Sequence, residues 1–365
     1  MPNTTASLAS LAGNTTVTFS TPTEVFGIIT IPISLVGTAG SIGCLGFIRT
    51  HAKQQSSSTN ALYINLSIAT LLFCGIVCPV HAYTQLAQQA SSFAQPTYLA
   101  KSACSFIGFF YFWTLTASAY SHSAIAANRL FIVVLQKSKL SSTSTTVFLI
   151  AASWFIAGMT FMWPLLRLGG TYGFSTESMK CTFSSLTSPE FVISYKVLYG
   201  FVPVIIMVIC YAAVFCKVAI SSRKLRKNPA VNQAGALLMP VNHRRQRNAE
   251  RKITQIAFIT CVGFIVCYVP SAIFGFVVKA RAALQSPMGM ALVFLMWIGC
   301  AANPLLYTYL NSDLKKRVHD VLKRRLPFAE RVFGGSSTNG NSMSLTGVKR
   351  ITSTVSNKVH PSRDQ

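Results

Sequence analysis

Seven long stretches of this 365-residue chain contain few or no charged side chains, and each is about 20 residues or longer. A helix needs about 20 apolar residues to cross the roughly 30 Å hydrocarbon core of a bilayer. The alternation of apolar and polar residues that is typical of membrane β-barrel strands is absent. We therefore expect an all-α membrane protein, a seven-transmembrane helix bundle with the spans Val25–Ile48, Ala61–Gln85, Ala103–Ala127, Val147–Leu166, Val197–Cys216, Ile253–Val278 and Ser286–Leu310.

The lysines and arginines lie mostly on one side of these spans. If the N-terminus is outside, only six of the 32 fall in outer segments, and the first 24 residues contain none. Because basic residues are enriched in cytoplasmic loops, we expect a multi-pass plasma-membrane protein with an extracellular N-terminus. The net charge of +24 then reflects this topology and attraction to the anionic inner leaflet, and it requires no nucleic-acid partner.

Both ends of the chain are expected to extend beyond the membrane domain. The sequons at Asn3 and Asn14 predict a glycosylated outer tail. After the last span, Asn311–Leu326 has apolar residues on one helical face and basic residues on the other. This pattern predicts an amphipathic eighth helix on the inner membrane surface, with a solvated basic helix as the alternative. The expected regions are an extracellular tail (1–24), a membrane domain (25–325) and a disordered cytoplasmic tail (326–365).

Two of the ten cysteines differ from the rest. The other eight lie within or at the ends of apolar spans, where a thiol behaves as a small hydrophobic group. Cys104 opens the third span at its outer end, and Cys181 lies in the polar outer loop between spans four and five. Both face an oxidising compartment, so we expect a disulfide between them.

Several short motifs follow one another in order on the seven spans. They are Asn128-Arg129-Leu130 at the inner end of the third span, Trp154, Pro203, Tyr211, Phe264 with Cys267-Tyr268-Val269-Pro270, and Asn303-Pro304-Leu305-Leu306-Tyr307. Together with the cysteine pair, they resemble the Asp-Arg-Tyr, Cys-Trp-x-Pro hinge and Asn-Pro-x-x-Tyr motifs of the rhodopsin-like G-protein-coupled receptors. The resemblance extends over essentially all of residues 25–325, with a tyrosine in place of the hinge tryptophan.

The resemblance implies a receptor and not an enzyme. Receptors of this class bind an extracellular small molecule, lipid or peptide in a pocket of the helix bundle. They activate a heterotrimeric G protein when the inner ends of helices three and six separate, and arrestin and a receptor kinase are further implied partners. No cofactor or metal is implied. The stretch TNALYINLSIATLLFC and the Asn-Arg pair are similar to the branch that holds melatonin receptors and the moody-type and germ-cell-migration orphan receptors of insects.

Arg129 is a lone charge in an apolar setting, and burying it is costly unless it is paired. Resting receptors of this class often pair this arginine with an acid at the inner end of helix six. Glu250, twenty residues before the hinge proline, is the one acid on the basic stretch that leads into that helix. We expect an Arg129–Glu250 contact, with local pairing of Glu250 to Arg251 as the alternative. On activation, Tyr211 and Tyr307 would move in to support the freed arginine.

Some positions depart from the family pattern. Thr70 replaces a usual buried aspartate, and Ser41 replaces a usual asparagine. That aspartate would hold a sodium ion together with Ser118 and Asn303, whereas a threonine hydroxyl coordinates a hard cation poorly. Asn128 removes the acid beside the arginine. We therefore expect neither sodium regulation nor tight silence of the resting state.

The charged residues of the spans limit the chemical class of the ligand. No Asp or Glu lies in the outer half of any span, which disfavours a biogenic amine because a buried ammonium needs a carboxylate. Tyr111 stands where amine receptors carry that carboxylate, and Trp297 stands where opsins carry their Schiff-base lysine, so retinal attachment is excluded. Basic residues near the rim favour an anionic or neutral polar ligand, although snorkelling explains them equally well: Arg167, Lys196, Lys279 and Arg281. Candidate pocket residues, with helix packing as the alternative, are His81, Tyr111, Phe112, Trp163, Tyr268, Phe274 and Trp297.

Three other classes of membrane protein fit the sequence less well. Transporters and channels usually place charged or broken-helix sites at the bilayer midplane, and the span centres here carry no Asp, Glu, Lys or Arg. A light-driven pump needs an intramembrane lysine and acids. An intramembrane hydrolase would have to use His122 with Ser121 and Ser123, a cluster without a separate acid or a glycine-rich nucleophile turn.

Overall fold

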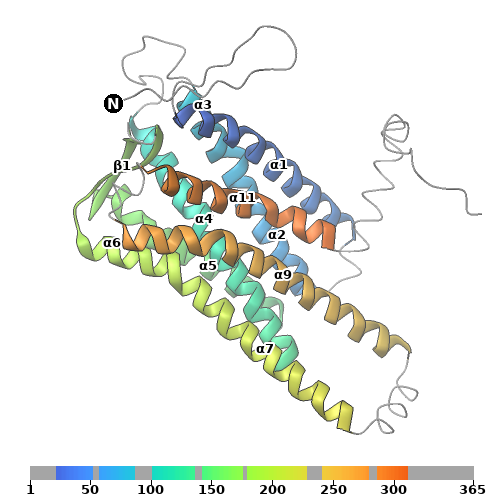
Figure 1. Ribbon diagram of the computed structural model, residues 1–365. Coiled ribbons are helices and arrows are strands. Elements are labelled where there is room, and N and C mark those ends of the chain that lie inside the picture. The colour runs from blue at the N-terminus through green and yellow to red at the C-terminus, as the bar shows by residue number, and fades with distance from the viewer. Residues whose placement is uncertain are drawn as a thin grey trace, which may run out of the picture. The chain divides into compact units, whose positions relative to one another are not determined.

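The computed structural model (Figure 1) describes residues 22–51, 57–86, 101–135, 142–175, 179–227, 241–278 and 286–310. These residues belong to one compact unit, Met1–Lys316, whereas a second unit, Arg317–Gln365, lies outside the described residues. The predicted eighth helix and the sequons at Asn3 and Asn14 also lie outside them. The elements, in which η marks a π-helical segment, are α1 (Pro22–His51), α2 (Ser57–Leu72), η2 (Phe73–Val77), α3 (Cys78–Leu86), α4 (Lys101–Leu130), η3 (Phe131–Leu135), α5 (Thr143–Leu165), β1 (Gly170–Ser175), β2 (Lys180–Leu186), α6 (Pro189–Tyr195), η5 (Lys196–Phe201), α7 (Val202–Lys227), α9 (Val241–Val277) and α11 (Pro287–Leu310).

Long helices pack side by side in a bundle (Figure 1). Three of the long helical segments consist of more than one element, because α2 continues through η2 into α3, α4 continues into η3, and α6 continues through η5 into α7. Within the described residues, six segments are long and apolar enough to cross a membrane: Glu24–Thr50, Ser58–Leu86, Thr143–Leu165, Pro189–Ser221, Arg251–Val277 and Pro287–Leu310.

The central helix of the bundle is α4, which is not among those six segments. It contacts α2, α5, α7, α9 and both strands. Because these neighbours and not lipid surround it, α4 can carry polar side chains that a lipid-facing helix could not. The buried polar side chains of α4 include Thr114, Thr116, Ser118, Ser121, His122 and Ser123.

The expected seven-helix bundle is confirmed.

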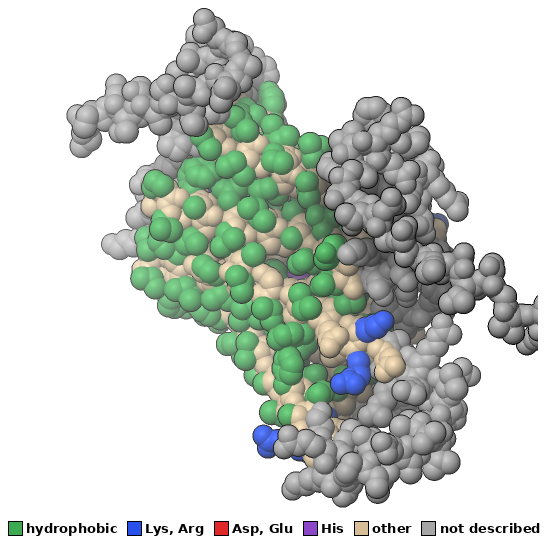
Figure 2. All heavy atoms as spheres, turned by 45° about the vertical axis from the view of Figure 1, so that its right-hand side comes forward, with side chains coloured by type: hydrophobic (Ala, Val, Ile, Leu, Met, Phe, Trp, Pro, Cys, Tyr) green, Lys and Arg blue, Asp and Glu red, His purple; other side chains and the backbone are tan. Residues whose placement is uncertain are grey.

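The bundle presents an apolar surface. Hydrophobic side chains cover the face seen in Figure 2, and the Lys and Arg side chains in view gather towards one end of it. Exposed apolar area of this extent is unfavourable in water and is accommodated by lipid tails. The large hydrophobic side chains that are more than half exposed include Leu35, Phe148, Phe155, Val266 and Val277.

Two π-helical segments are explained by the prolines that follow them. In η2, the N–H of Cys78 bonds to the carbonyl of Phe73, so the carbonyl of Cys74 would need its donor from position 79. Pro79 has no N–H. The freed carbonyl instead accepts a hydrogen bond from the hydroxyl of Ser34 on α1, at 2.7 Å.

The same arrangement recurs in η5. The N–H of Val202 bonds to the carbonyl of Val197, and the next donor along the chain is missing because position 203 is proline. The carbonyl of Leu198 is therefore free, and it accepts a hydrogen bond from the Tyr120 hydroxyl of α4 at 2.8 Å. Each proline thus produces a link between two helices where a helix of ordinary residues would have bonded to itself.

A buried polar network joins three helices in the inner half of the bundle, which is the half away from β1 and β2 (Figure 1). The Trp154 indole on α5 donates to the Asn65 side-chain oxygen on α2 at 2.7 Å. The Asn65 amide in turn donates to the Ser121 hydroxyl on α4 at 2.7 Å. Asn65 and Ser121 are both buried, so these bonds replace the water that the groups lose.

Glycine allows α1 to approach η2 closely. A Cβ atom added at Gly37 would lie 2.3 Å from the sulfur of Cys74 and 3.1 Å from the Cβ of Ala301. Real Cβ atoms essentially never lie as close as 2.3 Å to another atom, so the two segments would have to move apart. On the same helix, a Cβ added at Gly43 would meet no atom within 4 Å.

We expect Gly37→Ala to destabilise the purified protein by about 1–3 kcal/mol, the usual cost of overpacking a well-packed contact. Thermal unfolding in detergent measures this as a lower midpoint. Gly43→Ala is the matched control, and it should leave the midpoint unchanged or raise it slightly, because alanine favours the helix. Equal midpoints for the two variants would contradict the close packing of α1 on η2.

Candidate functional site

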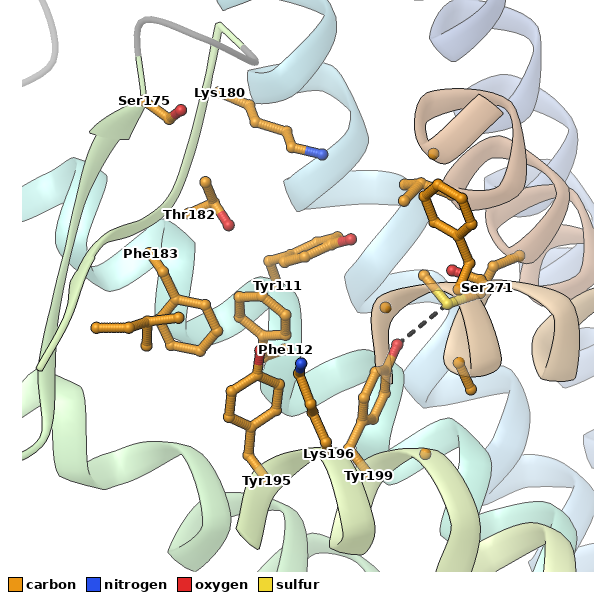
Figure 3. Close-up of a pocket in the computed structure, with 18 of the residues that line it drawn as sticks. Tyr111, Phe112, Ser175, Lys180, Thr182, Phe183, Tyr195, Lys196, Tyr199 and Ser271 are labelled. Atoms are coloured by element: carbon orange, nitrogen blue, oxygen red, sulfur yellow. Dashed lines mark hydrogen bonds between the residues drawn. The ribbon is translucent and has the colours of Figure 1, made fainter. Parts of the chain in front are cut away.

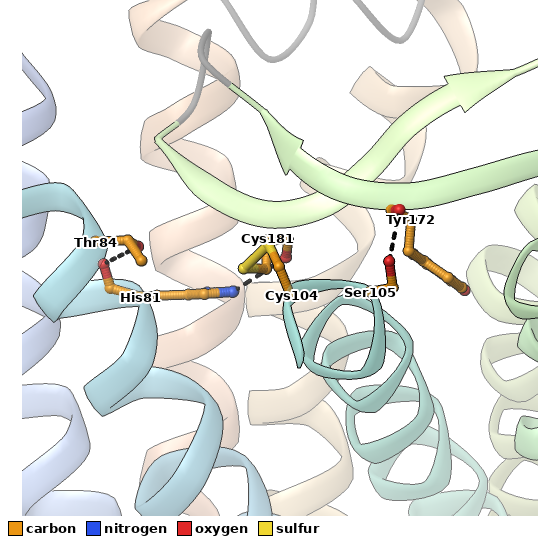
Figure 4. Close-up of a disulfide and its surroundings, with 6 residues drawn as sticks. All are labelled: His81, Thr84, Cys104, Ser105, Tyr172 and Cys181. Carbon is orange, nitrogen blue, oxygen red and sulfur yellow. Dashed lines mark hydrogen bonds between the residues drawn. A yellow bond between two sulfur atoms is a disulfide. The ribbon is translucent and has the colours of Figure 1, made fainter. Parts of the chain in front are cut away.

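A two-stranded hairpin lies over one end of the bundle. β1 and β2 pair antiparallel, and a disulfide joins Cys181 of β2 to Cys104 of α4 (Figure 4). His81 of α3 contacts the Cys181 carbonyl at 3.2 Å, and the Ser105 hydroxyl donates to the Tyr172 carbonyl of β1 at 2.9 Å. The expected disulfide is confirmed, whereas the hairpin was expected only as a polar loop.

Beneath the hairpin is a cavity of about 710 Å³. Figure 3 shows side chains from β2, α4, η5 and α9 pointing into it. This volume suits a drug-sized ligand, and a mostly apolar lining with a few polar groups is typical of such sites. Its lining residues include Tyr111, Phe112, Lys180, Thr182, Phe183, Tyr195, Lys196, Tyr199, Tyr268, Ser271, Phe274, Val293 and Met296.

Aromatic rings form much of the cavity wall. Phe112 stacks on Phe183 with ring centres 4.4 Å apart, and it packs edge-on against Tyr111 at 4.6 Å. The Tyr199 hydroxyl donates to the sulfur of Met296 at 3.1 Å, the bond drawn in Figure 3. These contacts fix the rings before any ligand enters, so the wall is largely preformed.

Lys180 brings a positive charge into the cavity from β2. The side chain is buried, and its ammonium lies 5.8 Å from the centre of the Tyr111 ring and 5.5 Å from that of the Trp297 ring. Ring faces attract a cation, but they replace water only in part. Burial therefore lowers the pKa of Lys180 to about 8.

The sequence-predicted pocket residues fall into three groups. Tyr111, Phe112, Tyr268 and Phe274 line the cavity. His81 and Trp297 are fully buried and do not line it; they stack on each other at 5.6 Å and both pack against Tyr111. The prediction for Trp163 differs from the structure, because this side chain is 49% exposed on α5 and is not part of the lining. The side chain lies on the outward side of α5.

A column of rings leads from the cavity towards the inner half of the bundle. Tyr199 packs edge-on against Tyr268 at 5.2 Å, and the Tyr268 hydroxyl donates to the Tyr199 carbonyl. Tyr268 stacks on Phe264 at 4.8 Å, and Phe264 stacks on His122 at 4.5 Å. His122 lies seven residues, or about two helical turns, before Arg129 on α4. The predicted hinge residues Phe264 and Tyr268 are thus packed between the cavity and α4, with Pro270 one turn from the cavity-lining Phe274.

At the inner end of the bundle, Arg129 is fully buried. Its guanidinium donates a hydrogen bond to the hydroxyl of Thr59 on α2. Sequence reasoning missed this partner, although Thr59 stands in the polar run that begins the second helix. The side chain of the expected partner, Glu250, lies outside the described residues, while its backbone belongs to α9.

The remaining motif residues of the inner half are also buried. Tyr307 of α11 stacks on Tyr63 of α2 with ring centres 3.9 Å apart. Asn128, Tyr211 and Asn303 are buried, and Pro304 lies within α11. Leu130 packs partly buried against the main core. The arrangement places the residues of three separate motifs on the inward sides of α4, α7 and α11.

Neutral groups occupy the region where family members hold sodium. Thr70 is buried, and its hydroxyl donates to the Cys300 carbonyl at 3.5 Å. The Cys300 thiol lies 3.9 Å from the Ser118 hydroxyl, to which it donates. The groups that remain are hydroxyls, a thiol, a carbonyl and the amide of Asn303, none of which supplies the charge that a dehydrated cation requires.

Comparison with known proteins gives the same class. Residues 44–307 match the model of the 7 transmembrane receptor (rhodopsin family). The chain is 20% identical over 338 residues to "Protein trapped in endoderm-1" of Drosophila melanogaster, covering 87% of this chain and 83% of that one. It is 22% identical over 361 residues to melatonin receptor type 1C of Xenopus laevis, covering 90% and 78%. The crystal structure of squid rhodopsin superposes with a TM-score of 0.64 at 16% identity, covering 86% and 89%.

The family model covers well over half of the chain, so the protein belongs to the rhodopsin family of seven-transmembrane receptors. It is a multi-pass receptor of the cell surface that signals through G proteins. The predicted similarity to melatonin receptors is confirmed.

Sodium should not stabilise this receptor. We expect the thermal midpoint of the detergent-purified protein to be the same in sodium chloride and in N-methylglucamine chloride at equal ionic strength, because Thr70 offers no charge to the ion. Thr70→Asp restores the carboxylate next to Ser118 and should gain a sodium-dependent rise of the midpoint. A sodium-specific rise in the unmodified protein would show that another group supplies the charge.

Proposed function

We propose that an extracellular ligand binds in the cavity beneath the β1–β2 hairpin and that its binding separates the inner ends of α4 and α9, so that a heterotrimeric G protein can dock. In this scheme the N-terminus and the hairpin are extracellular, as the distribution of lysine and arginine favours. The ring column from Tyr199 through Tyr268 and Phe264 to His122 is the observation that carries the proposal.

The column connects the cavity to both helices that have to move. Tyr268 lines the cavity and belongs to α9. His122, at the other end of the column, belongs to α4. A ligand that displaces the Tyr268 ring must therefore shift Phe264 against His122, because close-packed rings cannot compress. The displacement acts on α9 within a few residues of Pro270, where the helix bends most easily.

The inner ends are held together in the resting state by contacts of Arg129. Its hydrogen bond to Thr59 ties α4 to α2, and we propose that Glu250 on α9 provides a second link. Separation of α9 would release the arginine towards the G protein, with Tyr211 and Tyr307 supporting it. The buried bond to Thr59 is worth about 1–2 kcal/mol net, and a link to Glu250 near the membrane boundary about 1 kcal/mol. These values suit a switch between states a few kcal/mol apart.

Arrestin and a receptor kinase complete the proposed set of partners. The chain from Phe333 onward is rich in serine and threonine, which are the residues that a kinase phosphorylates. Added phosphates supply negative charge and strong acceptor oxygens for recognition by basic groups of an arrestin. Phosphorylation of the tail would thus end signalling, whereas ligand binding in the helix bundle would start it.

Removing either link should raise signalling without ligand. Glu250→Ala and Thr59→Val each remove about 1 kcal/mol from the resting state, which raises the active fraction roughly fivefold. Agonist-free G-protein activation at equal surface expression measures this rise. Asn128→Asp should lower the same signal, because it adds a second carboxylate beside Arg129.

Arg129→Ala is the control, and it should lose G-protein activation while the receptor still folds and reaches the surface. Unchanged or reduced basal signalling in both Glu250→Ala and Thr59→Val would contradict the proposed role of these links. A rise in only one of them would identify the link that holds the resting state.

A further inference from the structure

Both charged side chains among the described residues that line the cavity are cations. Lys180 extends into it from β2 and Lys196 from the start of η5, and Figure 3 shows them reaching into the cavity from opposite sides. None of the described lining residues is acidic. Glu190, on the nearby α6, lies on the exposed surface and accepts a hydrogen bond from the Ser188 hydroxyl.

The rest of the cavity is suited to an apolar body. The rings of Tyr111, Phe112, Phe183 and Tyr199 form one wall, and Ala272, Val293 and Met296 lie among the lining residues. The hydroxyls of Thr182 and Ser271 add neutral hydrogen-bonding groups. The cavity therefore combines two positive charges with a large apolar surface.

We propose that this cavity selects an organic anion: the ligand presents a carboxylate, sulfate or phosphate group to Lys180 and Lys196 and packs an apolar body on the aromatic wall. This inference rests on the proposed function, because it concerns the ligand of the same cavity. It also assigns Lys180 a role in ligand specificity that its position in a polar loop did not indicate.

The burial of Lys180 supports the inference. A buried ammonium is unfavourable unless a negative group or several hydrogen bonds replace its water. The Tyr111 and Trp297 rings attract it at 5.8 and 5.5 Å, but ring faces carry no net charge. An anionic ligand supplies the missing charge, whereas a cationic ligand would add a third positive group to the same space.

Charged thiol reagents test this selectivity without knowledge of the natural ligand. Ser271 lines the cavity, and Ser271→Cys introduces a thiol there with little change of shape. Intact cells are treated with 2-sulfonatoethyl methanethiosulfonate, an anion, or with 2-(trimethylammonium)ethyl methanethiosulfonate, a cation; neither reagent crosses the membrane. The rate of modification of the peptide that carries residue 271 is followed by mass spectrometry. The parent protein gives the background from Cys267, which is half-buried one turn away on α9.

We expect the anionic reagent to be favoured at residue 271 by about tenfold or more over its preference for a free thiol in solution, because a cavity lined by one sign of charge concentrates counter-ions. Lys180→Met and Lys196→Met should each reduce the preference severalfold, and Lys180→Arg should retain it. Lys217→Met is the matched control, since Lys217 is an exposed residue on α7 that does not line the cavity.

The preference should also fall between pH 7 and pH 9. Lys180, whose pKa is lowered to about 8, is mostly charged at the lower pH and mostly neutral at the higher one. The ratio of the two rates cancels the ionisation of the thiol itself. The other titratable groups that line this space are Tyr111 on α4, Tyr195 on α6, Lys196 and Tyr199 on η5, and Tyr268 on α9, while His81 on α3 packs behind Tyr111. Loss of the pH step in Lys180→Met therefore assigns it to Lys180.

The possible outcomes separate the two proposals. If both reagents react at residue 271 with the preference of a free thiol, or if the lysine variants leave the preference unchanged, anion selectivity is wrong while an accessible ligand cavity stands. If neither reagent reacts, the cavity is closed to the extracellular solution, and the proposed function fails with it. A preference for the cationic reagent would overturn the inference directly.

Discussion

Every backbone polar group inside a bilayer needs a partner within the protein, and the arrangement of this bundle follows from how that requirement is met at two prolines. Pro79 and Pro203 each leave a carbonyl five residues earlier without a backbone donor. The carbonyls of Cys74 and Leu198 are taken up by hydroxyls of neighbouring helices, at 2.7 and 2.8 Å. At each helix break a hydrogen bond therefore links two helices. These bonds fix the position of η2 against α1 and of η5 against α4.

The second of these helix breaks also shapes the cavity. Pro203 cannot donate to the carbonyl of Tyr199 four residues earlier, and that carbonyl accepts the hydroxyl of Tyr268 from α9. One proline thus holds η5 to α4 through Tyr120 and to α9 through Tyr268. Tyr199 and Tyr268 both line the cavity, so its inner end is built from the same contacts that satisfy the broken helix. Under the proposed function, a ligand that disturbs these rings would act on the hydrogen bond that joins α9 to η5.

Sequence reasoning recovered the features that depend on composition and order along the chain. The seven spans follow from the length of apolar stretches, and the disulfide follows from two cysteines that both lie outside the apolar core. Side-chain direction was harder, because packing sets it. Trp163 lies on the outward side of α5, and the hydrogen bond of Arg129 to Thr59 of α2 was not foreseen. Neither the rotamer of an arginine nor the rotation of a helix can be read from a motif.

Lys180 is a cavity residue whose position depends on the β1–β2 hairpin. As part of a polar loop it would extend into water with an ordinary pKa. In β2 it alternates with Cys181, whose side chain is bound to α4, so the neighbouring lysine has to take another direction. The pairing of Lys180 with Ser175 across the hairpin and the contact of His81 with the Cys181 carbonyl fix the position of β2, and the Lys180 side chain extends from it into the cavity. The disulfide thereby holds a cation over the rings of Tyr111 and Trp297.

The receptor consequently carries one buried cation near each end of α4, Lys180 above its outer end and Arg129 within its inner end. Each is costly unless compensated. The rings of Tyr111 and Trp297 face the first cation, and the Thr59 hydroxyl is one partner of the second. Under the proposed function, a ligand anion would improve the environment of the first charge and a G protein that of the second. A ligand shifts a two-state equilibrium only by its different affinity for the two states. Under the same proposal, that difference would arise in the ring column, because Tyr268 at one end lines the cavity and His122 at the other end lies about two turns from Arg129 on α4.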